Sequence, residues 1–211
     1  MARTTTAAPR SAIWRRSIAI GARAEIGGEL QREGERLVRL ALLHRHVVDD
    51  HEFGRALEID PKHTIALQNL GNAYRQKKDW PAAQRTLERA LALNPGDPEA
   101  NYSLGMVYAQ QNDTQHAYEY LQNAIAARPI YPEALNNLGV LYLRTRRPED
   151  AKRSFEESIR VAPLYDQAYL NLARVYAIEG DRAKAKAVLE DLLKQNPEHA
   201  EARQELQQLE P

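Results

Sequence analysis

Apolar residues from position 64 onward recur with the three- to four-residue spacing of amphipathic α-helices. The helical stretches are each about a dozen residues long and come in pairs joined by short turns. A helix pair of this size cannot bury its own apolar face, so neighbouring pairs must stack on one another. The pattern therefore predicts an all-α protein built from antiparallel helix pairs.

The helix pairs repeat with a period of 34 residues. Five of the 11 prolines lie on this lattice, at Pro61, Pro95, Pro129, Pro163 and Pro197. The same spacing joins four tyrosines and four alanines: Tyr74, Tyr108, Tyr142, Tyr176, Ala83, Ala117, Ala151 and Ala185. Gly71, Gly105 and Gly139 are spaced alike, with Ala173 in the fourth place. A fixed period of this size indicates a repeat array.

Small residues and prolines on the lattice predict how each pair is built. A side chain at Gly71 or its equivalents would push apart two helices that must approach closely, and Ala83 keeps the facing helix small there. Asp97 is a capping carboxylate ahead of Pro98 at the first helical position. The lattice prolines close the second helices, because the residue before a proline is pushed out of the helical conformation.

These residues resemble the tetratricopeptide repeat (TPR), which combines Leu-Gly, a tyrosine, an alanine, a large apolar residue and a closing proline. Four repeats are predicted, at residues 64–97, 98–131, 132–165 and 166–199. The departures are Asn101 in a large apolar slot, Ala173 in place of glycine and Leu192 in place of a small residue. The resemblance implies a right-handed α-α superhelix, a TPR solenoid, with a concave inner face.

Residues outside the four repeats are expected to cap or precede the array. Residues 200–211 form an amphipathic stretch that predicts a C-terminal capping helix, which an open solenoid end requires. Residues 29–63 are interpreted as a degenerate half-repeat or N-cap, in which Phe53 and Pro61 fit the closing half of a repeat. Residues 1–28 are expected to be a disordered or targeting-like basic tail.

The net charge is the sum of a basic N-terminal segment and a mildly acidic remainder. The chain has 29 basic and 29 acidic residues, a formal net charge of zero. Residues 1–24 contain five arginines and no acid, which leaves a formal charge of −5 for the remainder. The Arg-rich start resembles an organellar transit peptide, so import into an organelle is an alternative to the expected cytoplasmic location. The mildly acidic remainder does not favour nucleic-acid binding.

The amino-acid composition excludes cysteine-based sites and argues against a membrane protein. The 211 residues include no cysteine, which excludes disulfides, thiolate metal sites and cysteine nucleophiles. The mean hydropathy of −0.63 and the lack of a long apolar run predict a soluble chain without a membrane span. The sequence does not indicate an oligomeric state.

The resemblance also implies a ligand site. In TPR proteins the first helix of each pair lines the concave groove, and the corresponding positions here mix amides with apolar residues. The candidate peptide-binding residues are Asn69, Asn72, Tyr102, Met106, Asn136, Asn137, Val140, Asn171 and Arg174. Asn69, Asn137 and Asn171 share one slot, and this row is similar to the asparagine ladder of O-linked N-acetylglucosamine transferase. A carboxamide can pair with both polar groups of a peptide backbone, although the same side chains could instead bond across helices.

One further stretch of the sequence contains several residues of the types that bind metal ions. His44, His46, Asp49, Asp50 and His51 combine imidazoles and carboxylates within eight residues. On a helix, His44 and His51 share a face while His46 points elsewhere, which disfavours three-ligand closure. The run is expected to be a polar end of the degenerate repeat, so no metal site is predicted.

The sequence therefore favours a non-enzymatic scaffold that binds a peptide or helix of a partner protein in the concave groove. No cofactor is expected, because no nucleophile–base set, phosphate loop or paired acid is visible. Two alternatives stay open. The chain could be the substrate-recruiting TPR arm of a larger enzyme, such as a glycosyltransferase, or a metal-binding hydrolase that uses the run from His44 to His51.

Overall fold

The computed structural model describes residues 28, 31–36 and 50–209. All regular elements within these residues are α-helices. From Asp50 onward they are α2 (Asp50–Ile59), α3 (Thr64–Gln76), α4 (Trp80–Leu93), α5 (Pro98–Gln110), α6 (Thr114–Ala127), α7 (Pro132–Arg144), α8 (Pro148–Val161), α9 (Asp166–Ile178), α10 (Arg182–Gln195) and α11 (Ala200–Gln208).

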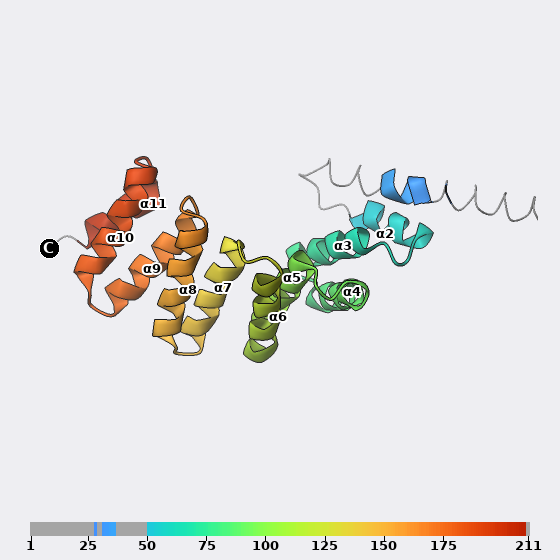
Figure 1. Ribbon diagram of the computed structural model, residues 1–211, viewed down its shortest axis with the longest axis horizontal. Coiled ribbons are helices and arrows are strands. Elements are labelled where there is room, and N and C mark those ends of the chain that lie inside the picture. The colour runs from blue at the N-terminus through green and yellow to red at the C-terminus, as the bar shows by residue number, and fades with distance from the viewer. Residues whose placement is uncertain (1–27, 29–30, 37–49, 210–211) are drawn as a thin grey trace, which may run out of the picture.

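The helices stack in chain order along the long axis of the molecule, from α2 at one end to α11 at the other (Figure 1). The most extensive contacts join the two helices of each pair, namely α3 with α4, α5 with α6, α7 with α8, and α9 with α10. The second helix of a pair then packs on the first helix of the next. The stack bends so that its two ends rise on the same side (Figure 1). The predicted all-α array of helix pairs is confirmed.

Each pair is held together by a large side chain that lies over a small residue. The large residues come from the second helices and are fully buried: Leu87, Leu121, Phe155 and Leu189. A Cβ atom added at Gly71 would lie 2.6 Å from Leu87 Cγ, and one at Gly139 would lie 2.5 Å from the Phe155 ring. Carbon atoms do not approach so closely, so the predicted role of these two glycines is confirmed.

The turn inside each pair adopts a left-handed backbone at one equivalent position. The residues there are Lys78, Asn112, Arg146 and Gly180, with φ values of 60°, 63°, 59° and 84°. Glycine and asparagine enter this region readily, whereas a lysine or arginine pays a steric cost because its Cβ crowds the backbone. The repeat geometry therefore imposes strain at Lys78 and Arg146.

The starts of the first helices use two kinds of N-cap. The Asp97 side chain accepts a 2.8 Å hydrogen bond from Ala100 N, and Pro98 follows at the first helical position, as predicted. Tyr131 and Tyr165 hold the same position before α7 and α9, and their side chains make no capping hydrogen bond. These two tyrosine side chains are therefore available for contacts elsewhere.

The two ends of the array differ. At the C-terminus, α11 packs on α10, buries Ala202 and forms the expected capping helix. At the N-terminus, α2 packs on α3 and buries Phe53 and Ala56. The tail predicted at residues 1–28 lies outside the described residues except for residue 28, and His44, His46 and Asp49 of the predicted ligand run also lie outside them. None of the described helices has the length and apolar character needed to cross a membrane.

Candidate functional site: the concave groove

The first helices of the pairs line the inner side of the bend. The helices α3 and α5 pack directly on one another, as do α7 and α9, whereas consecutive second helices make no comparable contact within the described residues. First helices that lie closer together than second helices place the former on the concave side. The nine candidate residues are all on α3, α5, α7 and α9.

Carboxamides tie these lining helices together. Asn171 on α9 donates a 2.8 Å hydrogen bond from Nδ2 to Asn136 Oδ1 on α7. Between α3 and α5, the Ser103 hydroxyl donates to Asn72 Oδ1. Asn136 is only 4% exposed, so this pair is part of the interface between repeats.

A longer bridge spans α5 and α7. These two first helices do not approach as closely as α3 and α5, and the gap is crossed by Tyr102, whose hydroxyl accepts a 2.9 Å hydrogen bond from Asn137 Nδ2. The same Asn137 amide lies 2.9 Å from Glu133 O in its own helix. The Tyr102 ring packs on the Tyr131 ring, with 5.1 Å between the centroids.

These contacts change the expected role of the asparagine row. Asn137 and Asn171 use their amide donors inside the array, and Asn69 donates to Ile65 O in its own helix at 2.8 Å. The bonding across helices that the sequence left as an alternative is therefore present at two of the three positions. The oxygens of Asn69 and Asn137 have no hydrogen-bond partner among the described residues, so they are the acceptors that remain for a ligand.

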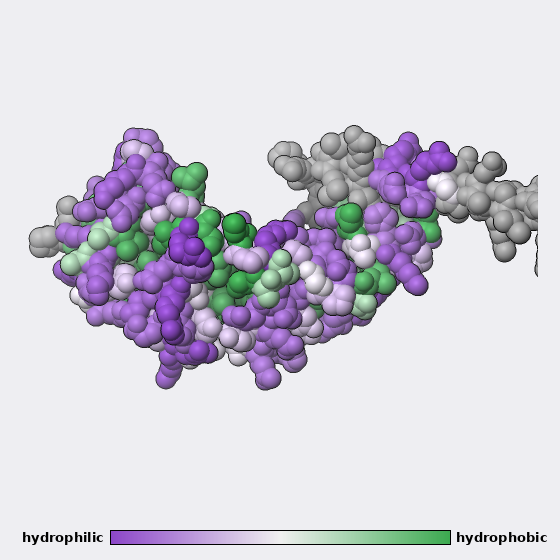
Figure 2. Space-filling view, viewed as in Figure 1, coloured by the Kyte–Doolittle hydropathy of each residue, from purple (hydrophilic) through white to green (hydrophobic). Residues whose placement is uncertain are grey.

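An apolar strip accompanies the amides. Met106 on α5 is half-buried, and Val140 and Leu143 on α7 are 36% and 37% exposed. Figure 2 shows apolar surface gathered in the hollow of the bend, between the polar rims. Exposed aliphatic side chains in a hollow are suited to bury apolar side chains of another molecule.

An acid, a tyrosine and an arginine form a compact cluster at one edge of the groove. The Tyr131 hydroxyl donates a 2.6 Å hydrogen bond to Glu99 Oε2, and Arg128 forms an ion pair with the other oxygen of the same carboxylate. The Arg128 guanidinium carbon lies 4.8 Å from the Tyr131 ring centroid, a cation–π contact. Burial, followed by the hydrogen bond to Glu99, raises the pKa of Tyr131, so this phenol stays protonated and donating.

The 34-residue pattern of the sequence did not predict this cluster. The missed signal is the residue just before a first helix, which is an ordinary capping aspartate at Asp97 but a tyrosine at Tyr131 and Tyr165. Burial also raises the pKa of the groove residue Tyr102 above that of a free phenol. The aromatic edge of the groove is therefore made of neutral hydroxyl groups.

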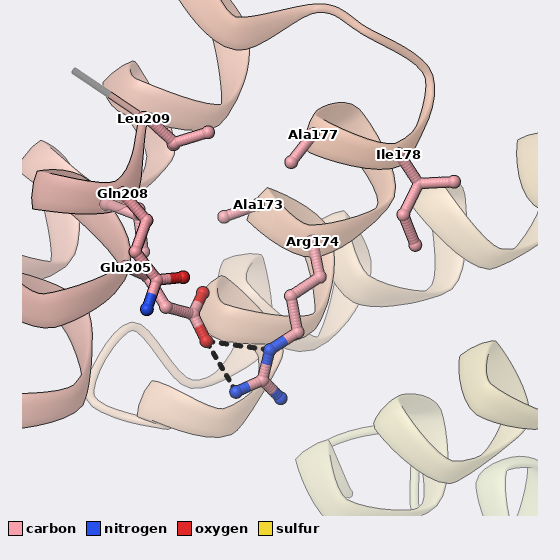
Figure 3. Close-up of a pocket in the computed structure, with 8 residues that line it drawn as sticks. Ala173, Arg174, Ala177, Ile178, Glu205, Gln208 and Leu209 are labelled. Atoms are coloured by element: carbon pink, nitrogen blue, oxygen red, sulfur yellow. Dashed lines mark hydrogen bonds and ion pairs between the residues drawn. The ribbon is translucent and has the colours of Figure 1, made fainter. Parts of the chain in front are cut away.

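Arg174 closes the groove at its C-terminal end. It donates from Nε to Glu205 Oε1 at 2.8 Å and also pairs with Glu201, so it fastens the capping helix α11 to α9. Beside this pair lies a cavity of about 310 Å³ between α9, α10 and α11. Figure 3 shows Ala173 and Ala177 facing Leu209 across it, with the ion pair at the rim.

Metal chemistry is not evident in the groove. Within the described residues, no group of three or more histidine, aspartate or glutamate side chains is arranged to hold a metal ion. Asp50 and His51 begin α2, but the rest of their sequence run lies outside the description.

The fold and the lining of the groove define a helical repeat protein of the α-solenoid class. Two family models, each described as tetratricopeptide repeat, match residues 70–136 and 146–209. Together they account for more than half of the sequence, and the chain belongs to the tetratricopeptide repeat family. Among curated proteins, none matches this sequence.

Solved structures of similar fold agree with this assignment. A structure of MamA superposes with a TM-score of 0.65 at 26% identity, over 72% of this chain and 89% of that one. The Pseudomonas aeruginosa pilF protein gives 0.71 at 23% identity, over 79% and 78%. YrrB, reported as a TPR protein with an unusual peptide-binding site, gives 0.65 at 24% identity, over 89% and 95%. The likeness confirms the right-handed α-α superhelix, and the tetratricopeptide repeat fold suggests a scaffold for protein–protein interaction.

Proposed function

We propose that this protein is a non-enzymatic scaffold whose concave groove binds an extended segment of a partner protein. The observation behind this proposal is that exposed apolar side chains, and carboxamide oxygens without a hydrogen-bond partner among the described residues, lie on the lining helices α3, α5 and α7. Val140 and Leu143 would bury apolar side chains of the segment. The oxygens of Asn69 and Asn137 would accept hydrogen bonds from its backbone amides.

The groove chemistry supports a tolerant, moderate interaction. Each added hydrogen bond contributes about 0.5–1.5 kcal/mol net, and a few such bonds with a small apolar contact predict micromolar affinity. The similar fold of YrrB, which is reported to have a peptide-binding site, is compatible with this use of the solenoid. Backbone recognition by amide oxygens would accept many sequences, with selectivity added by side-chain contacts.

The test must avoid residues that hold the array together. Truncating Tyr102, Asn137 or Asn171 would break contacts between repeats, so a loss of binding could reflect loosened packing. Val140 and Leu143 are exposed on the lining helix α7 and make no such bonds. The test variant is therefore Val140→Lys combined with Leu143→Lys, and the matched control is Leu93→Lys on α4, where an apolar residue is 41% exposed on an outer helix.

The readout is site-specific photo-crosslinking in cells. A photoreactive amino acid placed at Met106 is expected to capture discrete partner segments, which mass spectrometry identifies, while the same group at Leu93 captures none of them. The double lysine variant should lower the crosslinking yield at Met106 at least several-fold, and Leu93→Lys should not. Equal yields from the wild type and the double variant would refute binding in the groove.

A further inference from the structure

The arginine cluster in the second repeat has an incomplete copy in the third. Glu99, Tyr131 and Arg128 recur 34 residues later as Glu133, Tyr165 and Ala162. The third repeat therefore keeps the acid and the tyrosine, but it has an alanine in place of the arginine.

The backbone is the same at both places. Arg128 and Ala162 are the C-cap residues of α6 and α8, with φ and ψ of −136° and 93° in the first case and −143° and 81° in the second. Tyr131 and Tyr165 are the N-cap residues of the following first helices. The side chains of the third repeat thus start from positions equivalent to those that hold Arg128.

The acceptors of the third repeat have no hydrogen-bond or ion-pair partner among the described residues. The Glu133 side chain is exposed, and its carboxylate makes no hydrogen bond or ion pair with any residue that the structure describes. The Tyr165 hydroxyl likewise has no hydrogen bond among those residues. Asn137 donates both to the Tyr102 hydroxyl and to Glu133 O, at 2.9 Å each, which brings Tyr102 beside the start of α7. Burial, followed by the charge of Glu133 and by the neighbouring Tyr102, raises the pKa of Tyr165 to about 12.

We propose that Glu133, Tyr165 and Tyr102 form a receptor site for an arginine side chain of the bound segment. The guest guanidinium would pair with the Glu133 carboxylate and lie against a tyrosine ring, as Arg128 does with Glu99 and Tyr131. A planar guanidinium suits both contacts better than an ammonium group does. This assignment rests on the proposed function, because it names one side chain of the segment that the groove binds.

Acetylated heptapeptides of glycine and serine with one central arginine test the site. The comparison peptide carries citrulline, which keeps the shape of arginine and removes its charge, and a third carries lysine. Binding is followed by NMR shifts of the Tyr165 ring and the Val140 methyl groups, up to about 5 mM peptide. The arginine peptide is expected to bind at least about fivefold more tightly than the citrulline peptide and more tightly than the lysine peptide.

Three variants locate the effect. Glu133→Gln should bring the ratio between arginine and citrulline peptides close to one, whereas Glu119→Gln, the same change at an exposed acid of α6, should leave the ratio unchanged. Ala162→Arg supplies the missing guanidinium from within the chain and should abolish the preference for the arginine peptide. It should also raise the urea midpoint, and that gain should disappear in the double variant with Glu133→Gln.

The proposal falls if arginine and citrulline peptides bind the wild type equally, if neither shifts the Tyr165 ring in this range, or if Glu133→Gln keeps the preference. Equal binding of lysine and arginine would overturn the guanidinium assignment. These results are distinct from a failure of the groove itself. Partner segments that still crosslink at Met106 with equal yield in Glu133→Gln would leave the scaffold function standing while removing the arginine site.

Discussion

Asn171 on α9 donates a 2.8 Å hydrogen bond to the buried Asn136 Oδ1 on α7, so two side chains of the helices that line the groove join consecutive repeats. The bond links residues 35 positions apart in the chain. A contact of this kind contributes to the interface energy between neighbouring repeats, because the stability of a linear array depends on the contacts that each repeat makes with the next. The residues that line the groove therefore stabilise the array and also form the candidate ligand surface.

Asn136→Ala is expected to lower the free energy of unfolding by about 1–2 kcal/mol, because Asn171 would lose its acceptor in a largely buried place. The matched change is Asn69→Ala, whose amide donates only to Ile65 O within its own helix. Urea denaturation followed by circular dichroism measures both. A loss at Asn69→Ala as large as that at Asn136→Ala would mean that the bond between repeats contributes nothing special.

Gly139→Ala is expected to destabilise the protein by about 1–3 kcal/mol, because the new methyl group overlaps the Phe155 ring. The double variant Gly139→Ala/Phe155→Leu should cost less than the sum of its single changes. It recreates the pair that the fourth repeat uses naturally, in which Ala173 and Leu189 share one apolar cluster. Strict additivity in urea denaturation would contradict this steric explanation.

Arg146→Gly is expected to raise the free energy of unfolding by about 0.5–1 kcal/mol, because glycine removes the steric cost of a φ of 59°. The guanidinium of Arg146 makes no hydrogen bond or ion pair with the described residues, so little is lost. Gly180 already occupies the equivalent turn, and Gly180→Ala serves as the reverse change. Thermal unfolding of both variants should shift in opposite directions, and a shift in the same direction would refute the strain argument.

Alkaline pH is expected to weaken the fold. Burial raises the pKa of Tyr108, Tyr142 and Tyr165 to about 12, above the value near 10 of a free phenol. The folded state thus favours the neutral phenols, so their contribution is complete below about pH 10 and is lost as the pH rises toward 12. The urea midpoint should fall across this range.

Tyr165→Phe isolates one of these groups. Its hydroxyl makes no hydrogen bond with the described residues, so the substitution removes a titrating proton without breaking a bond. The variant should show a shallower fall of the urea midpoint between pH 10 and 12 than the wild type. An unchanged slope would show that Tyr165 does not contribute to the alkaline destabilisation.

Helix positions, caps and the close approach of Gly71 and Gly139 to the facing helix could be predicted from sequence, because these features depend on residues near one another in the chain and on a strict period. The period also placed the candidate groove residues on the first helices. It could not predict which side chains would be left for a ligand. Asn136 and Asn137 are neighbours on one helix, yet the first bonds forward to Asn171 and the second back to Tyr102.

That difference arises from the distances between repeats, which no local pattern encodes. A wider gap between α5 and α7 requires the long Tyr102 side chain, whereas α7 and α9 lie close enough for two asparagines to meet. The charged edge of the groove also differs between repeats. Glu99 forms an ion pair with Arg128, whereas the position equivalent to Arg128 near Glu133 is occupied by Ala162. The local sequence by itself determined the stack of helix pairs. The packing of one repeat on the next determined which polar groups can still form hydrogen bonds with a partner.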